Sequence, residues 1–312
     1  MAVLVIGGCG FIGKHIVAAL SSSGVNSVVF DRIGDPGNNS EFCTYLSGDI
    51  GDLARIKTSI ERYGVTHVIH LVSTTLPKAS NEDMKADLSG NVIQMLSLLD
   101  LFVESKIEKI LFMSSGGTVY GNPQTLPVTE SHPTDPICSY GIGKLTIEKY
   151  LALYKHLYGL NYVVLRAANP YGNGQNPLAG QGIVANFVHK IHCGLPLEVW
   201  GDGQIIRDYF DVRDLADLAR RALFSEHCGV FNAGSGVGTS INEIIKQIAS
   251  ITHVAPNVIY KEHRIFDVPA IILNCEKAER TFAWKPAINL EAGLSDYISW
   301  HLNNCDVVPG QV

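Results

Sequence analysis

The first half of the chain alternates between short apolar runs and longer segments in which apolar residues recur every three or four positions. Short runs rich in Val, Ile and Leu are typical of buried strands, and the longer periodic segments are typical of helices that bury one face. The predicted strands are residues 2–6, 27–30, 66–71, 110–114 and 162–166. The predicted helices are residues 13–22, 53–63, 89–104 and 140–158. Strands that are apolar on both faces and alternate with helices predict a doubly wound α/β domain with a parallel sheet.

The pattern changes after Asn169, where the Gly- and Asn-rich stretch NPYGNGQNPLAGQG is followed by mixed helices and short strands. This stretch contains Tyr and Leu anchors, so it reads as a binding loop at a domain junction and not as a flexible linker. A second Gly-rich turn, NAGSGVG, spans residues 232–238. We therefore expect a first domain over residues 1–168 and a smaller α/β substrate domain over residues 169–312, with some chain crossing back to the first domain.

Composition and charge narrow the class of protein. The 312 residues are 46% hydrophobic and 17% charged, which is typical of a globular protein with a large core. A net charge of −6 and the absence of basic runs argue against a nucleic-acid partner. The seven cysteines are scattered and never spaced Cys-x-x-Cys, which favours a reducing compartment. The sequence also lacks a signal peptide and an apolar run long enough for a membrane span, so we expect a cytoplasmic location.

A glycine-rich segment, GGCGFIG, directly follows the first predicted strand and opens the first predicted helix. Gly7, Gly10 and Gly13 have the spacing that lets a tight turn approach a pyrophosphate at a helix N-terminus. Asp31 ends the second strand about 20 residues later, where a carboxylate can bind the adenosine ribose hydroxyls. This arrangement favours NAD over NADP, because Asp31 would repel a 2′-phosphate even though Arg32 beside it could attract one.

Other residues near strand ends complete the expected cofactor site. Phe11 and Ile12 lie within the glycine segment, and Leu71 follows the third predicted strand. Asp49 and Ile50 belong to the GDI segment, where Asp49 either contacts the adenine amine or caps the next helix. We expect His70 at a strand end to be a packed residue.

Tyr140 and Lys144 form a Tyr-x-x-x-Lys pair, whose spacing places a phenol and an ammonium on one helix face. A tyrosine is a poor base at neutral pH unless a nearby cation stabilises its phenolate, and Lys144 can supply that cation. Such a pair also occurs on solvated helix surfaces, so the spacing alone does not establish a catalytic site. By contrast, His189 and His192 are three apart on a predicted helix without a third ligand, and we expect no metal site.

The ordered motifs GGCGFIG, GDI, VIHLVS, SSGGTVYG, YGIGK, LRAANPYG and IRDYFDVRDLADL resemble the extended short-chain dehydrogenase/reductase family. The similarity is to its nucleotide-sugar epimerase/dehydratase branch, which includes the UDP-glucose 4-epimerases, and it covers nearly the whole chain. The resemblance implies a Rossmann-type domain that holds NAD and a smaller domain that grips the diphosphate of a UDP-sugar. It also implies a homodimer formed through the helices near residues 89–104 and 138–158.

The resemblance assigns roles to the Tyr-Lys pair and its neighbours. Tyr140 matches the catalytic tyrosine, and Lys144 matches the lysine that binds the nicotinamide ribose and lowers the tyrosine pKa. The usual Ser or Thr partner is replaced by Gly116 in this sequence. Ser115 and Thr118 are the nearest candidates, either as the catalytic hydroxyl or as ordinary strand-end residues, and Thr118 is also a candidate substrate contact.

The resemblance also implies a set of substrate contacts. Arg207 matches a diphosphate-binding arginine, a role that suits its forked donors, although Arg207 could instead pair with Asp208 or Asp211. The remaining expected contacts are Asn169, Asn186, Phe187, Arg264 and Asp267. Ile271 stands where related epimerases have a large aromatic residue, and its smaller side chain suggests room for a 2-N-acetyl group.

The implied reaction is 4-epimerisation of a UDP-hexose through a transient 4-keto sugar. Tyr140 would take the proton of the 4-hydroxyl while NAD takes the hydride from carbon 4, and the hydride would return to the opposite face. A 4,6-dehydratase needs an Asp-Glu pair where this chain has Gly117 and Thr118. A decarboxylase or reductase acting on a nucleotide sugar, or a non-catalytic NAD-sensing protein, would also be compatible with these motifs, and the carrier could be another nucleotide or a lipid diphosphate.

Overall fold

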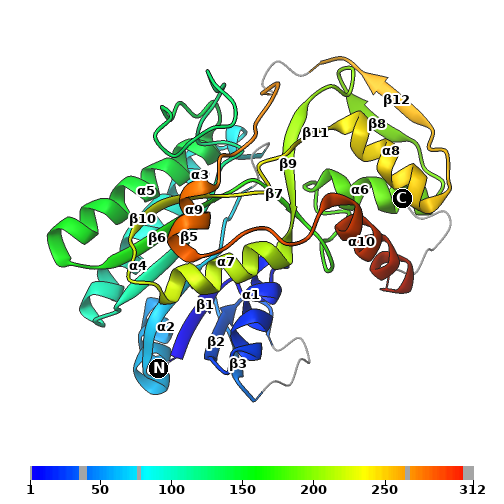
Figure 1. Ribbon diagram of the computed structural model, residues 1–312. Coiled ribbons are helices and arrows are strands. Elements are labelled where there is room, and N and C mark those ends of the chain that lie inside the picture. The colour runs from blue at the N-terminus through cyan, green and yellow to red at the C-terminus, as the bar shows by residue number, and fades with distance from the viewer. Residues whose placement is uncertain (1, 35–40, 76–78, 264–267, 305–312) are drawn as a thin grey trace.

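The computed structural model describes residues 2–34, 41–75, 79–263 and 268–304. Its largest element is a parallel sheet with the strand order β10-β6-β5-β4-β1-β2-β3 (Figure 1). The sheet strands are β1 (Ala2–Ile6), β2 (Asn26–Asp31), β3 (Cys43–Ser47), β4 (Val65–His70), β5 (Lys109–Ser115), β6 (Asn161–Ala167) and β10 (Gly229–Ala233). The order reverses next to β1, which is the arrangement of a Rossmann-type fold. All five strands predicted from the apolar runs are confirmed, as is the short strand expected before Asp49, which is β3, while the distant β10 was not predicted.

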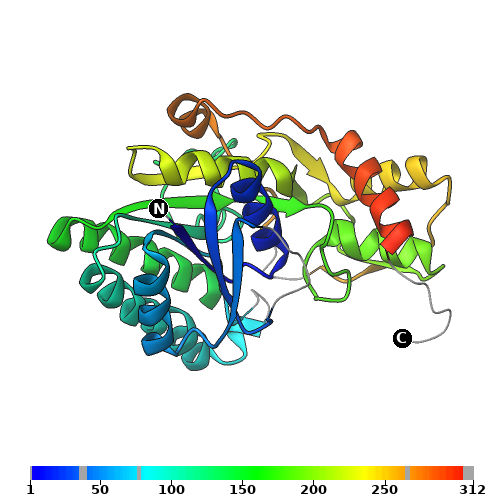
Figure 2. The ribbon, with the colours of Figure 1, turned by 90° about the horizontal axis from the view of Figure 1, so that it is seen from below.

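Helices cover both faces of this sheet, as a doubly wound fold requires. One hydrophobic core lies between the sheet and the helices α1 (Phe11–Ser22), α7 (Val212–Phe224) and α9 (Glu276–Phe282). The other lies between the sheet and the helices α2 (Leu53–Tyr63), α4 (Gln94–Glu104) and α5 (Ser139–Tyr158). Figure 2 shows the yellow-green α7 on one side of the sheet and the cyan and green helices on the other. The predicted α/β class is therefore confirmed.

The predicted helix over residues 89–104 is longer and less regular in the structure. Helix α3 (Met84–Asp87) continues through a π-helix (Leu88–Ile93) into α4. Within the π-helical turn, the Asn91 amide donates to the Asp87 carboxylate over 2.9 Å, and its oxygen accepts the Thr74 amide hydrogen. These contacts tie the helix to the segment after β4, which explains a local irregularity that periodicity alone does not predict.

The segment Met84–Glu104 is long and apolar enough to pass a length-and-hydropathy test for a membrane span. Its apolar residues Met95, Leu98, Leu99 and Phe102 are buried in the core beneath the sheet. Packing within the domain therefore explains part of the apolar character of this segment, of which an 18-residue stretch is 39% buried.

The smaller lobe is built mainly from chain after residue 168. It has a three-stranded sheet of β11 (Gly238–Ser240), β9 (Ile206–Asp211) and β7 (Asn169–Tyr171), and a pair formed by β12 (Val258–Lys261) and β8 (Leu197–Trp200). Its core is closed by α6 (Ile183–His192), α8 (Ile241–Thr252) and α10 (Leu290–Asn304). Between these elements the chain returns to the large sheet through α7 and β10, so the larger lobe contains chain from both sides of residue 168.

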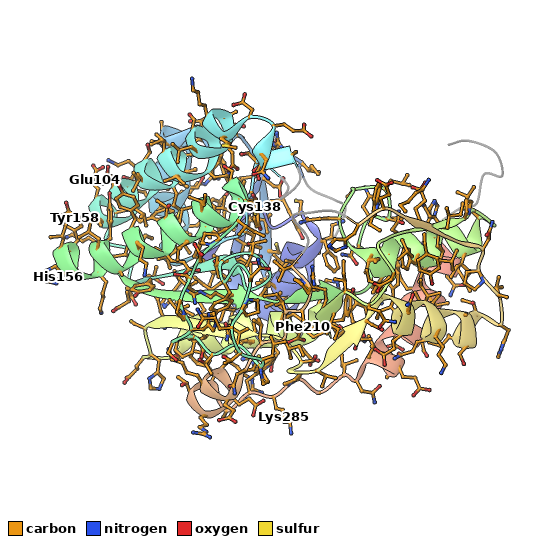
Figure 3. The ribbon with its side chains drawn as sticks, turned by 90° about the horizontal axis from the view of Figure 1, so that it is seen from above. Glu104, Cys138, His156, Tyr158, Phe210 and Lys285 are labelled. Carbon is orange, nitrogen blue, oxygen red and sulfur yellow. The ribbon has the colours of Figure 1, made fainter. Side chains whose placement is uncertain are left out.

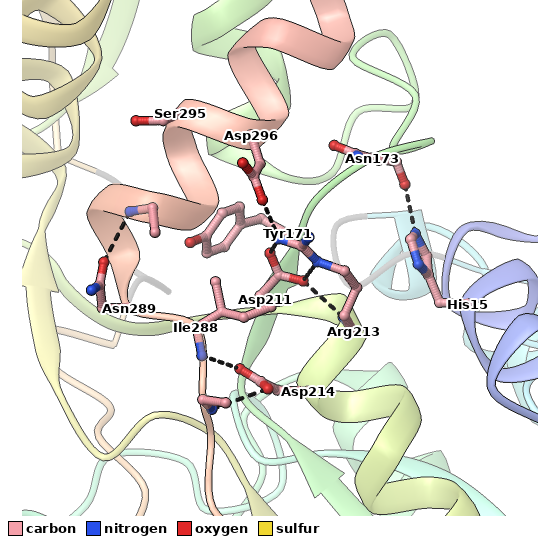
Figure 4. Close-up of polar contacts among 12 residues, drawn as sticks. His15, Tyr171, Asn173, Asp211, Arg213, Asp214, Ile288, Asn289, Ser295 and Asp296 are labelled. Carbon is pink, nitrogen blue, oxygen red and sulfur yellow. Dashed lines mark hydrogen bonds and ion pairs between the residues drawn. The ribbon is translucent and has the colours of Figure 1, made fainter. Parts of the chain in front are cut away.

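Polar contacts join the two lobes at the start of α7 (Figure 4). Asp211 forms a two-pronged ion pair with Arg213, which also reaches Asp296 on α10 over 2.9 Å. One turn later, the Asp214 carboxylate accepts the amide hydrogens of Ala287 and Ile288, both at 3.1 Å. The segment that leads into α10 is thus fastened to a helix of the larger lobe, which fixes the lobes on either side of a cavity.

Candidate active site

The glycine turn between β1 and α1 is shaped for close approach of a ligand. Gly7 has a φ of 85°, a left-handed conformation that favours glycine. A Cβ on Gly13 would lie 2.5 Å from the Gly7 carbonyl oxygen, so only glycine lets α1 pack this closely. Gly10 caps α1 without a side-chain hydrogen bond, which leaves amide hydrogens of the first turn open to an anion. The turn therefore fits the pyrophosphate of a dinucleotide, and Gly10, Phe11 and Ile12 line the main cavity.

Asp31 lies at the end of β2, directly beside the glycine turn. Its carboxylate accepts the Cys9 amide hydrogen over 3.0 Å and the Ile33 amide hydrogen over 3.2 Å. These bonds hold a carboxylate next to the turn, which is the position that a ribose diol needs. Arg32 is exposed, and its carbonyl oxygen accepts the Ser47 hydroxyl.

The structure excludes one of the two roles considered for Asp49 in the GDI segment. The side chain of Asp49 accepts the Gly51 amide hydrogen over 2.8 Å, whereas Asp52 caps α2 by accepting the Arg55 amide hydrogen. The interpretation of Asp49 as the helix N-cap is therefore wrong, because the cap lies three residues later. Ile50 lines a small cavity of about 10 Å³ behind the Tyr-Lys pair, and Leu71 lines the main cavity.

Tyr140 and Lys144 lie together on the first turns of α5, and both line the main cavity. The Lys144 ammonium lies 5.5 Å from the centre of the Tyr140 ring and donates to the Met113 carbonyl oxygen over 2.9 Å. Burial raises the pKa of Tyr140 to about 12, with further contributions from Cys138 and Asp87. Burial lowers the pKa of Lys144 to about 8, partly offset by Glu148 and Asp87. Figure 3 shows α5 running from Cys138, which lines the cavity, to Tyr158 at its far end.

The segment after β5 places both candidate hydroxyls at the cavity. Ser115 and Thr118 line its wall, and the Thr118 hydroxyl oxygen is buried without a hydrogen-bond partner among the described residues. Gly116 lies between them, where a Cβ would approach the Leu273 Cδ1 atom to 2.5 Å. The structure therefore leaves no room at residue 116 for the usual hydroxyl, unless Leu273 moves.

On the opposite side of the cavity, the structure brings two of the predicted substrate contacts together. Asn169 and Arg207 line the wall, and the Asn169 amide donates to the Asp208 carbonyl oxygen over 3.2 Å. The Asp208 carboxylate accepts hydrogen bonds from Ser235, Gly236 and Leu273, while Asp211 pairs with Arg213. The considered pairing of Arg207 with either aspartate is not found, because both carboxylates have other partners.

Three other predicted substrate contacts do not line the cavity. The Phe187 side chain is only 2% exposed and belongs to the core of the smaller lobe, because α6 turns it inward. Asn186 donates to the Pro177 carbonyl oxygen over 3.4 Å. Ile271 is fully buried in the core of the larger lobe, so its size does not set the width of the cavity, and the argument for an N-acetyl group loses its basis. Arg264 and Asp267 lie outside the described residues.

The cavity itself lies between the two lobes and has a volume of about 1100 Å³, large enough for two nucleotide-sized ligands. Several of its lining residues were missed by sequence reasoning: Gln175, Gln181, Glu198, Trp200 and Tyr209. The alternating burial of β8, with Leu197 and Val199 inward and Glu198 and Trp200 outward, was the available signal. That alternation did not reveal which sheet face meets the cavity.

Three histidines cluster away from this cavity, where α6 meets α10. His189 and His192 lie 5.5 and 5.4 Å from the ring centre of His301, in edge-to-face contact. His301 is a third histidine of this cluster that the sequence did not reveal. Among residues that the structure describes, we find no group of His, Cys, Asp or Glu that can hold a metal ion. His301 is fully buried, and burial lowers its pKa to about 4.

Known proteins similar to this chain are consistent with a dinucleotide site at the glycine turn. Residues 3–234 match the model of the NAD dependent epimerase/dehydratase family. A putative UDP-glucose 4-epimerase of Methanocaldococcus jannaschii is 34% identical, over 97% of this chain and 99% of that protein. The structure is similar to Thermotoga maritima UDP-glucose 4-epimerase with UDP-glucose, at a TM-score of 0.93 and 33% identity over 97% of this chain and 99% of that one.

The structure is also similar to that of Thermus thermophilus UDP-glucose 4-epimerase in complex with NAD, at a TM-score of 0.92 and 32% identity. That match covers 98% of this chain and 100% of the other. The glycine turn, the carboxylate beside it and the Tyr-Lys pair on α5 thus belong to a chain whose relatives align almost from end to end. The chain belongs to the NAD-dependent epimerase/dehydratase family and is an enzyme with NAD as its cofactor.

Proposed function

We propose that this enzyme interconverts the 4-epimers of a UDP-hexose, UDP-glucose and UDP-galactose, through a transient 4-keto sugar. One observation carries the proposal: a single cavity joins the glycine turn, the Tyr140–Lys144 pair and, on the opposite lobe, Asn169 and Arg207. This cavity would bring together a base, a cofactor-binding turn and a diphosphate-binding arginine. Such a combination suits the oxidation of a sugar that is attached to a nucleotide diphosphate. The UDP-glucose 4-epimerases to which the chain is similar support the choice of substrate.

Tyr140 is the proposed base that removes the proton of the sugar 4-hydroxyl and later returns it. NAD held at the glycine turn and beside Lys144 would supply a hydride acceptor and donor for carbon 4 of the sugar. With its pKa raised to about 12 by burial, the Tyr140 phenol needs a neighbouring cation before it can ionise at neutral pH. Lys144 meets this need, because a pKa of about 8 leaves most of its ammonium charged at pH 7.

Thr118 is the hydroxyl that we propose in place of the residue missing at Gly116. Its oxygen is buried and lacks a partner among the described residues, and because Thr118 lines the cavity, a rotation of this side chain would let a ligand provide the hydrogen bond that the protein does not. Ser115 also lines the cavity, but its hydroxyl is not among these buried oxygens without a partner. We therefore assign the proton-sharing role beside Tyr140 to Thr118.

The nucleotide is proposed to bind on the smaller lobe. Arg207 would hold the diphosphate with its forked donors, and Trp200 lines the same cavity. Asn169, Asn186, Arg264 and Asp267 stay proposed contacts on the basis of the resemblance. Firm binding of the nucleotide with few charged contacts to the hexose would let the 4-keto sugar turn and present its other face.

The decisive experiment incubates the purified protein, without added cofactor, with a panel of nucleotide sugars and resolves the products by NMR. The panel contains UDP-glucose, UDP-galactose, both UDP-N-acetylhexosamines, UDP-glucuronate and dTDP-glucose. Interconversion of UDP-glucose and UDP-galactose without net NADH is the expected result. A 4-keto-6-deoxy product, release of carbon dioxide or a requirement for added NAD(P)H would refute 4-epimerisation. Failure to turn over any sugar while NAD stays bound would instead favour an NAD-sensing protein.

We also propose a homodimer formed by α4, α5 and the turns before α4. Large apolar side chains are exposed on this face: Leu88, Ile93, Ile142, Leu153 and Leu157. Ile142, Leu153 and Leu157 follow one side of α5, which favours a second copy as the partner. Light scattering after gel filtration should give twice the monomer mass, and Leu157→Glu should reduce it; a monomeric wild-type protein would refute the dimer.

A cytoplasmic location remains part of the proposal. The described cysteines, Cys9, Cys43, Cys138, Cys193, Cys228 and Cys275, are all free thiols, as expected in a reducing compartment. Cell fractionation that places the enzyme outside the cytoplasm would contradict it.

A further inference from the structure

A buried ion pair lies one helical turn beyond Lys144. Glu148 on α5 accepts three hydrogen bonds from Arg166 on β6, the shortest at 2.6 Å, and a fourth from the Ser114 hydroxyl at 2.5 Å. Both charged side chains are nearly fully buried, with 2% of Glu148 and 5% of Arg166 exposed. Burying two charges brings little net stability, so stability alone is a weak explanation for the pair.

The same pair is connected to Lys144 through the end of β5. Lys144 and Glu148 are four residues apart and share one face of α5. The Lys144 ammonium donates to the carbonyl oxygen of Met113, and Glu148 accepts from Ser114, the next residue. The two side chains thus form hydrogen bonds with adjacent residues of β5. These bonds hold the turn of α5 that carries Lys144 against the sheet.

Glu148 does not line the cavity, whereas Lys144, Met113 and Ser114 do. We propose that Glu148, held in place by Arg166 and Ser114, is a positioning residue that keeps the buried Lys144 ammonium charged and aimed at the Tyr140 side of the cavity. The importance of this role for turnover rests on the proposed function of Lys144. The electrostatic role itself does not depend on any substrate.

Lys144 faces few groups that can sustain its charge. Asp87 is the second carboxylate near it, and its oxygens are already engaged by Ser139 and Asn91. His70, on β4, is buried and stays neutral, because burial and Lys144 lower its pKa to about 3. The Tyr140 and Phe112 rings interact with the Lys144 ammonium only through their faces, as cation–π contacts. Removal of the Glu148 carboxylate should therefore lower the pKa of Lys144 more than removal of Asp87, since Arg166 would then be left as an unbalanced positive charge.

The test measures the charge of Lys144 directly. Cyanate, which carbamylates neutral amines, is applied to the folded protein from pH 6 to 10, and modification of Lys144 is followed by peptide mass spectrometry. The wild-type midpoint is expected near the Lys144 pKa of about 8. Glu148→Gln should lower the midpoint by on the order of one pH unit, because a nearby negative charge is lost. The conservative variant Glu148→Asp should restore most of the difference.

Two further variants keep the test conclusive. The double variant Glu148→Leu/Arg166→Met removes the pair without leaving a lone buried charge, and it should also lower the midpoint, by less. Glu104→Gln neutralises an exposed carboxylate on α4 that pairs with Lys57, and it should leave the midpoint unchanged. An unshifted midpoint in every folded Glu148 variant would overturn the proposal.

Turnover provides a separate readout. If the enzyme is an epimerase, the alkaline limb of kcat should move to lower pH in Glu148→Gln by the same amount, with KM nearly unchanged. An unmoved kcat profile beside a shifted labelling midpoint would overturn the link to turnover. A wild-type protein without epimerase activity would refute the proposed function, while the labelling midpoints would still decide the role of Glu148.

Discussion

Gly116 and Leu273 allow a quantitative test of why the usual hydroxyl is missing from this site. In Gly116→Ser, the new Cβ would lie 2.5 Å from the Leu273 Cδ1 atom and 3.0 Å from the Arg166 carbonyl oxygen. Leu273 is fully buried, and the carbonyl belongs to a central strand, so neither can move away freely. Overpacking of this kind costs about 1–3 kcal/mol of the free energy of unfolding.

A double-mutant cycle isolates the collision. Leu273→Ala alone should cost about 2–5 kcal/mol, because it leaves a cavity in the core. In the double variant Gly116→Ser/Leu273→Ala, the serine occupies part of the vacated space. The combined loss should therefore fall short of the sum by on the order of 1–2 kcal/mol.

Urea unfolding followed by circular dichroism measures each corner of the cycle. Gly117→Ser is the matched control, since its Cβ would meet only the Ser115 hydroxyl oxygen at 3.9 Å, and its effect should stay within about 0.5 kcal/mol. If Gly116→Ser were as stable as Gly117→Ser, or if the two losses in the cycle simply added, the steric explanation would be wrong.

Three other predictions concern the site and the smaller lobe. Tyr140→Phe should abolish epimerisation while bound NAD, measured after denaturation, stays at the wild-type amount; retained turnover would exclude Tyr140 as the base. Thr118→Val should lower kcat about 10- to 100-fold and Ser115→Ala much less, and the reverse order would move the hydroxyl role to Ser115. His301 binds a proton more readily in the unfolded chain, because its pKa in the folded protein is about 4. The neutral side chain therefore makes its full contribution to the free energy of unfolding above pH ~6.5, and this contribution is lost as pH falls toward 4. In His301→Phe, the free energy of unfolding should fall less between pH ~6.5 and 4, by at most about 3 kcal/mol. An unchanged pH dependence of urea unfolding would refute the role of His301 in this loss.

Local patterns account for most of what could be predicted. The five strands and the glycine turn were found because a buried strand and a phosphate turn each follow from a few consecutive residues. The Tyr-x-x-x-Lys spacing placed both side chains on one face of α5, since helix geometry fixes residues four apart. The β10 strand was missed because its place beside β6 depends on a contact between residues more than 60 positions apart in the sequence.

The sequence by itself determined which residues this protein offers for chemistry: the turn that suits a dinucleotide, the carboxylate Asp31 beside it and the proposed base with its cation. Only the tertiary structure decided which residues meet. It buried Ile271 and Phe187, opened Trp200 to the cavity, and set Leu273 against Gly116. The reason is physical, because spacing along a helix or strand is fixed by backbone geometry. Contacts between distant segments depend instead on how the whole core packs, and no short pattern records that.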